Sequence, residues 1–442
     1  MRIRSELSRL SELYLSPSSR GTQFRKAVAT RTDAPRALEL SDLSDPARFT
    51  KALEALLRPE RLDTESRTAL WRATKLIASH VDDGDHAAIT DELRNLGEST
   101  ASLGGIGHER LFTLTRAARA AGLFSASGPF ETAALESFGG RARQLRGLRG
   151  HIQRARYALA VGDIEQAAVH AAPLRRRYVR NRFPEVQATL RYVDLAAGDA
   201  PAERDVTAHQ DEQLTSIIRD GTVLVYGPGP TDDGLDPNLR DVPVARVLMP
   251  GVSWDSGTDL AGNRVDLAYA NGQSTAWLAS LSPEELQDVV THSRTVILKG
   301  RGTRSVRVQS LATNVYLSIP RPSMLDGSLN MAPIMIWDLL SRGCVHIHVI
   351  GASFFLGAQA YRSDHLRVFP GQGRSNAFGS LGNKFERCFS LAHHGPASNR
   401  QVVLNLLRTK RITGDTLFRK ALSLSAMEYL SELDAAYGIP RR

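Results

Sequence analysis

The sequence predicts an α/β protein in which an all-helical N-terminal region precedes a mostly parallel sheet. Before about residue 205, apolar residues recur with the spacing of helices that bury one face. After it, short apolar runs of strand type alternate with helical patterns, as in a parallel sheet covered on both faces. A chain of 442 residues is also too long for one ordinary core. We therefore expect a helical domain over 1–205 and a sheet domain over 206–442.

The N-terminal region contains several amphipathic segments. The clearest lie at 47–60, 65–81, 108–124 and 156–174. The last has small residues around a Gly-Asp turn, which is typical of a tetratricopeptide-type helix pair, but no clean 34-residue period is present. These features predict a helical bundle or irregular helical repeat that binds an acceptor or a partner. The Gly- and Ala-rich stretch 196–205 is the expected linker.

The C-terminal region contains five predicted strands, at 222–227, 244–251, 265–271, 293–300 and 345–351. Helical patterns separate several of them, for example "SPEELQDVVTH" and "MAPIMIWDLLSRG". In open parallel sheets, ligands bind at the carboxyl ends of the strands. The residues that directly follow these strands are therefore the first candidates for a functional site.

The overall composition and charge limit the class of protein. Only two cysteines occur, the N-terminus lacks a signal-peptide core, and no run of 18 apolar residues is present, so we expect a cytoplasmic protein. The formal net charge is +9, and residues 141–182 carry eleven arginines against two acidic residues. This basic segment is either a solvated helix face or a surface that contacts anionic lipid or an acidic polymer. Nucleic acid is not expected, because no recognisable nucleic-acid motif accompanies the charge.

Small and polar residues follow the predicted strands and precede the helix at 331–343. The stretch "VYGPGPT" ends the first strand, and "VDLAYAN" ends another on an asparagine. Each feature could approach a phosphate or sugar, or could simply end a strand or cap a helix. The candidates are Gly227, Gly229, Pro230, Thr231, Asn271, Ser328 and Asn330.

Three further groups of residues bear on metal binding and catalysis. His346 and His348 share one face of a predicted strand, but without a third ligand they are expected to be core histidines. The neighbouring aspartates 232 and 233 are expected to be solvated, so no metal site is assigned. His393 and His394 precede a helix that starts with a Pro-containing turn. A histidine in such a place is either a general base or an ordinary surface residue.

The order of these elements resembles that of the CMP-sialic-acid-dependent sialyltransferases of animals and bacteria, over about residues 220–440. The animal family's large motif is similar to "VYGPGPT" followed by a strand ending at Asn271, and its small motif is similar to "SLNMAPIMIWDLLSRGCVHIHVIG". In the bacterial family two tyrosines follow this last glycine, here Gly351. The matching positions are Phe355, a departure, and Tyr361, a match.

The last family motif places a histidine five residues before an acidic residue at a helix start. His394 matches the histidine, and Asn399 stands at the position of the acid. Pro228 replaces an asparagine of the large motif, and Ser328 and Asn330 stand in for the small motif's usual residues. The resemblance implies a Rossmann-like, glycosyltransferase-A-type domain with His394 as the catalytic base. It also implies that the other matching residues bind the CMP donor.

The function that the resemblance implies is metal-independent, inverting transfer of sialic acid or a related 2-keto sugar acid from a CMP-activated donor. The acceptor would be a hydroxyl of a bacterial surface glycan or glycolipid, and the donor is a substrate, so no cofactor is expected. The arginine-rich helices would place the enzyme peripherally at the inner face of the membrane. The alternative is a catalytically inactive adaptor that keeps the nucleotide-sugar fold and binds glycan or protein through its helical domain. The departures Pro228, Phe355 and Asn399 favour that alternative.

Overall fold

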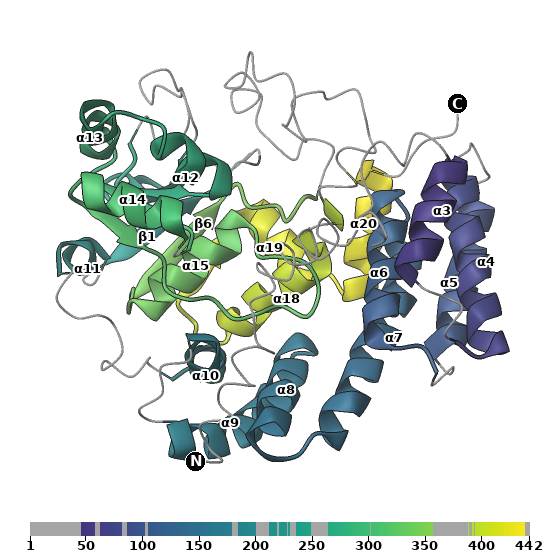
Figure 1. Cartoon of the computed structure of the whole chain (residues 1–442). Coiled ribbons are helices and arrows are strands. Elements are labelled where there is room, and N and C mark those ends of the chain that lie inside the picture. Colours follow the sequence, from purple (N-terminus) through teal and green to yellow (C-terminus); the bar gives the residue numbers. More distant parts are fainter. Residues whose placement is uncertain are drawn as a thin grey trace.

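A computed structural model describes most of the chain outside its first 45 residues. The described residues are 46–57, 62–81, 86–101, 105–178, 184–199, 212–218, 221–227, 229, 236–248, 264–300, 302–356, 388, 391–392 and 394–437. Within them the protein is a mixed α/β structure, which confirms the predicted fold class at that level (Figure 1).

Helices make up the described part of the chain before residue 200. They are α3 (Pro46–Leu57), α4 (Thr64–Val81), α5 (His86–Ala101), α6 (His108–Ala120), α7 (Phe124–Gln144), α8 (Gly147–Ala160), α9 (Ile164–Tyr178) and α10 (Pro184–Ala197). The predicted Gly-Asp turn joins α8 and α9, where Gly162 takes the left-handed backbone conformation with φ of 78°. The described residues of the four segments predicted from periodicity are helical, apart from turns at 121–123 and 161–163.

The described strands form one sheet in which every pair is parallel. They are β1 (Thr222–Tyr226), β2 (Val244–Leu248), β3 (Leu267–Ala270), β4 (Thr295–Leu298), β5 (Val315–Leu317), β6 (His346–Ile350) and β7 (Ile412–Gly414). Their order is β5-β4-β3-β2-β1-β6-β7. The five predicted strands are present, whereas the short β5 and β7 were not predicted.

The connections of the sheet are mostly helical. They are η4 (Pro237–Leu239), α12 (Gly272–Leu278), α13 (Pro283–His292), α14 (Thr303–Leu311), α15 (Met331–Ser341) and α18 (Pro396–Leu407). α11 (Glu212–Ile218) precedes the sheet, and α19 (Thr416–Ser423) and α20 (Ala426–Tyr437) follow it. Helix α13 begins with a capping box in which Ser282 and Glu285 satisfy each other's backbone N–H groups. The predicted helices 282–292 and 331–343 correspond to α13 and α15.

Both faces of the sheet are covered, because alternate residues of each strand belong to different cores. Val223 and Val225 of β1 pack in the cluster that contains α15 and α18, while Leu224 and Tyr226 face the opposite side. On that opposite side, α12, α13 and α14 cover strands β3 and β4. This double coverage explains why the strands are nearly continuous apolar runs.

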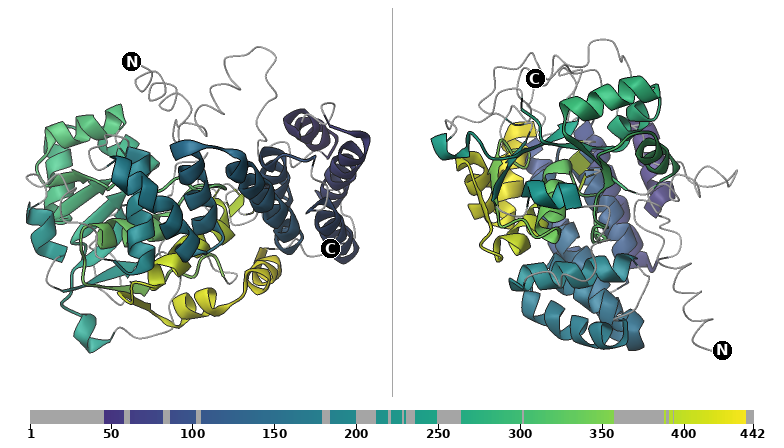
Figure 2. Two further views of the ribbon diagram at one scale, coloured as in Figure 1. Left: turned by 90° about the horizontal axis from the view of Figure 1, so that it is seen from below. Right: turned by 90° about the vertical axis from the view of Figure 1, so that its left-hand side faces the viewer.

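The helices before residue 200 share buried contacts with the C-terminal region, across the boundary expected near residue 205 (Figure 2). The Asp434 carboxylate of α20 accepts hydrogen bonds from the backbone N–H groups of Phe124 and Ser125, at 2.7 and 3.0 Å, and so caps α7. Asn405 of α18 donates to the Leu159 carbonyl and the Tyr192 hydroxyl, at 2.8 and 2.9 Å. The helical region is therefore joined to the sheet by buried polar contacts as well as by apolar packing.

Candidate functional site

The topology places two helix N-termini at the carboxyl edge of the sheet. Helix α15 lies between β5 and β6 in the chain, and α18 lies between β6 and β7. A helix that connects parallel strands runs back across the sheet, so it starts near the edge where the preceding strand ends. The strand order also reverses beside β1, whose neighbours are β2 and β6. Ligands of open parallel sheets bind at such a point.

Ser328 and His394, which lie 66 residues apart in the sequence, meet at this edge. The Ser328 Oγ lies 3.2 Å from the His394 Nδ1. Two glycines allow the segments to cross at this distance. A Cβ on Gly327 would lie 2.5 Å from the main-chain carbonyl of His394, and Gly327 and Gly395 have φ values of 69° and 61°. The half-buried imidazole therefore sits against the loop that leads into α15.

Asn399 holds the same two segments together. Its Oδ1 accepts a hydrogen bond from the Asn330 backbone N–H at 2.7 Å. Its Nδ2 donates to the carbonyls of Ser328 at 3.0 Å and Gly395 at 3.1 Å, and also to that of His394. Only 1% of Asn399 is exposed. Asn399 therefore connects the two segments from a buried position, and this role requires both its accepting Oδ1 and its donating Nδ2.

We expect Asn399→Asp to destabilise the protein and lower any activity, although it restores the acid of the family motif. A carboxylate would replace the donating Nδ2 with an oxygen that faces carbonyl oxygens, which costs about 1–3 kcal/mol for a buried group left unpaired. Urea denaturation measures the loss, and the exposed Asn238→Asp serves as control. An Asn399→Asp variant that is as stable as the wild type would contradict this role.

The N-terminus of α15 lies beside this junction. Asn330 is its N-cap residue, yet its side chain makes no capping hydrogen bond. The first turn of a helix carries spare N–H groups and about half a positive charge, so it favours an anion. The structure therefore brings the predicted residues Ser328, Asn330 and His394 together at this junction.

Gly227, Gly229 and Gly351 form a second close crossing, where β1 and β6 end. The N–H groups of Gly227 and Gly229 donate to the carbonyls of Ile350 and Gly351, both at 2.7 Å. A Cβ on Gly227 would lie 2.4 Å from the Gly351 carbonyl oxygen. The Gly351 N–H in turn donates to the buried Asp415 Oδ2 at 2.7 Å. These glycines hold the two strand ends together, while Pro230, Thr231 and Tyr361 lie outside the described residues.

Other predicted residues have local structural partners. The Asn271 side chain caps α12, because its Oδ1 accepts from the N–H groups of Gln273 and Ser274, both at 2.9 Å. His346 and His348 are half-buried rather than core residues. The His346 Nε2 and the His348 Nδ1 contact the Thr413 hydroxyl, at 2.8 and 2.9 Å. Within the described ranges, no group of three metal-ligating side chains is present.

The exit of β6 has an unusual backbone. Phe354 and Phe355 both have left-handed φ values, of 50° and 70°. Each such residue typically costs about 1–3 kcal/mol and persists only where the surroundings hold it. Here the Tyr429 hydroxyl donates to the Phe354 carbonyl at 2.6 Å, and the Phe354 and Phe418 rings lie 5.9 Å apart. Phe355, which stands at the position of the family's first tyrosine, packs partly buried against the main core.

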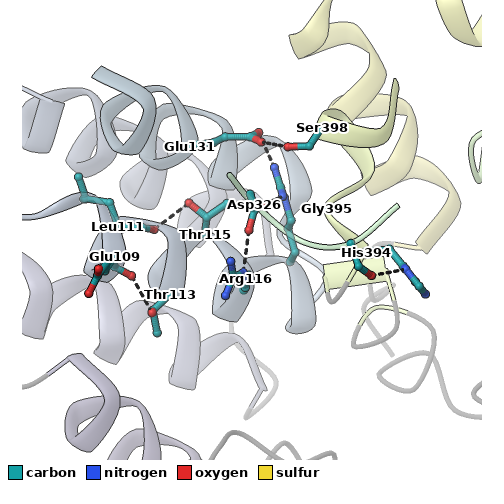
Figure 3. A network of polar contacts seen from close by, with 12 residues as sticks. Glu109, Leu111, Thr113, Thr115, Arg116, Glu131, Asp326, His394, Gly395 and Ser398 are labelled. Atoms are coloured by element: carbon teal, nitrogen blue, oxygen red, sulfur yellow. Dashed lines mark hydrogen bonds and ion pairs between the residues drawn. The ribbon is translucent and has the colours of Figure 1, made fainter. Parts of the chain in front are cut away.

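A buried ionic network links the helical region to the junction (Figure 3). The Asp326 carboxylate, just before Gly327, accepts from Arg116 Nε at 2.7 Å and from Arg119 Nη1 at 2.9 Å. Arg119 also pairs with Glu131 at 2.5 Å, and Glu131 accepts from the Ser398 hydroxyl at 3.5 Å. The side chains of Arg119 and Asp326 are 0% and 1% exposed. Helices α6 and α7 thus fix the loops that carry Ser328 and His394.

The network also shifts the ionisation of its members. Burial alone would lower the pKa of the Arg119 guanidinium, but the carboxylates of Glu131 and Asp326 outweigh it and raise that pKa. Burial raises the pKa of the Glu131 carboxyl, with Arg119 opposing the rise. The arginine is therefore charged, and its charge favours the carboxylate form of Glu131 against the effect of burial.

Sequence reasoning missed two half-buried cations that follow β4 and β5: Lys299, which contacts this junction, and Arg321. Lys299 directly follows β4, and its Nζ donates to the Leu329 carbonyl at 3.3 Å, between Ser328 and Asn330. A cation at the end of the predicted strand 293–300 was the available clue for Lys299. Arg321 follows β5, a three-residue strand that was not predicted from the sequence. Without that strand, no sequence pattern placed Arg321 at the carboxyl edge of the sheet.

No described helix combines the length and the apolar character that crossing a membrane requires. Comparison of the chain with family models, curated proteins and solved structures found no match. The geometry of the site and the sequence resemblance therefore carry the functional argument.

Proposed function

We propose that the chain is a metal-independent, inverting glycosyltransferase with a Rossmann-like, glycosyltransferase-A-type domain. Its donor would be a CMP-activated sialic acid or related 2-keto sugar acid. Its acceptor would be a hydroxyl of a bacterial surface glycan or glycolipid. The observation that carries the proposal is the contact of His394 with Ser328 at the start of α15, because it joins two motifs that the sequence resemblance assigns to one active site.

The proposed chemistry follows from the charges at this junction. The acceptor oxygen attacks the anomeric carbon, the bond from that carbon to the phosphate oxygen breaks, and CMP leaves with the electron pair. The positive end of α15 and Ser328 favour the negative charge that develops on the leaving phosphate. An imidazole nitrogen of His394 takes the acceptor's proton as the new bond forms on the opposite face. A base of this kind contributes about 10²–10⁴-fold to the rate.

The acceptor would be made on the inner side of a bacterial membrane. Exposed arginines on α7, α8 and α9 include Arg141, Arg143, Arg146 and Arg176, with Arg146 at the N-cap of α8. They would hold the enzyme near anionic lipid. Sedimentation with liposomes tests this part of the proposal. Binding that does not depend on anionic lipid would remove it.

Nucleotide binding tests the donor assignment. In a thermal-shift series with CMP, CDP, UDP and GDP, we expect CMP to raise the melting temperature most. A ligand at 100 times its Kd stabilises the folded state by about 2.7 kcal/mol. A larger shift with UDP or GDP would contradict a CMP-linked donor, and the absence of any shift would contradict nucleotide binding.

The second candidate is a binding protein without transfer activity. It is favoured by Asn399, whose carboxamide is fully engaged in holding two loops and offers no acid. Phe355 stands at the position of a phosphate-binding tyrosine, and this departure also favours a protein without transfer activity. Such a protein would bind CMP without releasing it from a CMP-sugar.

A further inference from the structure

Lys299 and Arg321 are two cations that follow the carboxyl ends of β4 and β5, near enough for the charge of Arg321 to act on Lys299. Both are half-buried. Among the described residues, no carboxylate lies within ion-pair distance of either one. Burial and the nearby Arg321 guanidinium lower the pKa of Lys299 to about 7, and burial lowers the pKa of Arg321. Holding two such charges together away from water is costly unless an anion joins them.

Hydrogen bonds of regular structure hold the backbone segments that carry both cations. The Lys299 backbone N–H donates to the Ala270 carbonyl at 3.0 Å, which continues the pairing of β3 and β4. The loop that carries Arg321 is fixed by Asp338 of α15, whose Oδ1 accepts from the Ile319 N–H at 2.6 Å. Arg342 donates to the Leu317 carbonyl at 2.8 Å and to Asp338 at 2.9 Å. The backbone on which the two cations stand is therefore tied to β3 and to α15.

This pair adjoins the junction described above. The Lys299 Nζ contacts the carbonyl of Leu329, whose neighbours Ser328 and Asn330 contact His394 and Asn399. An anionic group bound by Lys299 and Arg321 would thus lie next to the start of α15.

We propose that Lys299 and Arg321 form a subsite for an oxyanion of the substrate, either a carboxylate or a phosphoryl group. The proposal rests on the proposed function in that it takes the bound molecule to be a CMP-linked sugar acid, which carries both groups. A guanidinium binds such planar or tetrahedral oxyanions through two N–H groups, and the ammonium supplies a second point of charge.

Calorimetry on the full chain tests the subsite with the double variant Lys299→Met/Arg321→Met. The matched control is Arg419→Met/Lys420→Met on α19, which removes the same charge from exposed positions outside the site. We expect the first variant to bind CMP-sialic acid at least tenfold more weakly and the control to bind it normally. If the first variant loses affinity for CMP alone, the subsite binds a phosphoryl group. If it loses affinity for free sialic acid alone, the subsite binds a carboxylate.

The stability of the unliganded variant separates a ligand site from a structural role. Because folding brings these two like charges out of water, we expect the double variant to melt at the same or a higher temperature than the wild type. Unchanged affinity for CMP-sialic acid, CMP and sialic acid would overturn the subsite while leaving the proposed function intact. If the wild type binds none of these, inorganic phosphate is the probe. A phosphate-induced rise in melting temperature that the double variant lacks would keep the subsite and reject the CMP donor, and no rise would overturn both.

The pH dependence of CMP affinity gives a further test of the subsite. Lys299 loses its proton as the pH rises through about 7, and Arg321 is the charged group that acts on it. Above pH 7 the CMP phosphate is already doubly charged. We therefore expect CMP affinity to fall by up to about tenfold per pH unit between pH 7 and 9. Lys299→Arg should flatten this dependence, because a guanidinium keeps its charge. An equally steep fall in that variant would contradict the assignment.

Discussion

His394→Ala is expected to lower the rate of sugar transfer by about 10²–10⁴-fold while leaving the affinity for CMP unchanged. The imidazole is the group that takes the acceptor's proton in the proposed mechanism, whereas the nucleotide is held by other residues. The substitution should not disturb the fold locally, because Asn399 contacts the main-chain carbonyl of residue 394, which alanine retains. Turnover with CMP-sialic acid and calorimetry with CMP measure the two quantities separately.

The matched control for this experiment is His292→Ala, which changes a histidine at the end of α13 outside the site. We expect wild-type turnover from it. Ser328→Ala should cause a smaller loss than His394→Ala and shift the pH profile of turnover, because Ser328 orients the ring through Nδ1. Wild-type turnover in His394→Ala would show that His394 is not the base, and His393 would then be the next candidate.

Arg119→Met is expected to reduce the free energy of unfolding by about 3–5 kcal/mol, because it removes one partner from a buried ionic network. The substitution leaves Glu131 without its arginine and leaves Asp326 with only Arg116. Methionine replaces the aliphatic part of the arginine side chain with an unbranched apolar chain, so the loss reports the uncompensated charge more than lost apolar packing. Urea denaturation measures the effect.

The control is Arg72→Met, which removes an exposed arginine that also pairs with a glutamate, at 2.6 Å. Exposed pairs contribute about 0–1 kcal/mol, so little change is expected. The deficit of Arg119→Met should shrink as the pH falls from 7.5 to 5. Burial already raises the pKa of Glu131, and without Arg119 that pKa rises further, so lower pH neutralises the unpaired group. A deficit below 1 kcal/mol at pH 7.5 would contradict the role of the network.

The sequence predicted the elements whose patterns are long or strongly apolar. The N-terminal helices, the parallel sheet and five of its strands follow from periodicity and apolar runs. β5 and β7 were missed because each has only three residues, and their pairing depends on neighbouring strands far away in the sequence. Short strands carry too little local preference to be recognised alone.

For the candidate site, sequence reasoning identified residues but not how they are held. It placed Ser328, Asn330 and His394 in motifs, yet it could not reveal that Asn399 connects their loops or that Arg119 reaches Asp326 from a helix 207 residues earlier. Contacts at such separations arise from tertiary packing, which a single sequence does not encode in any local pattern. The same reason explains why Arg321 was not paired with Lys299.

The release of CMP from CMP-sialic acid, with and without glycan acceptors, tests the central claim most directly. We expect the wild-type protein to release CMP, with the rate rising when an acceptor hydroxyl is supplied, and His394→Ala to release about 10²–10⁴-fold less. Tight binding of CMP by the wild type with no release under any acceptor condition would contradict the transferase and favour the binding protein.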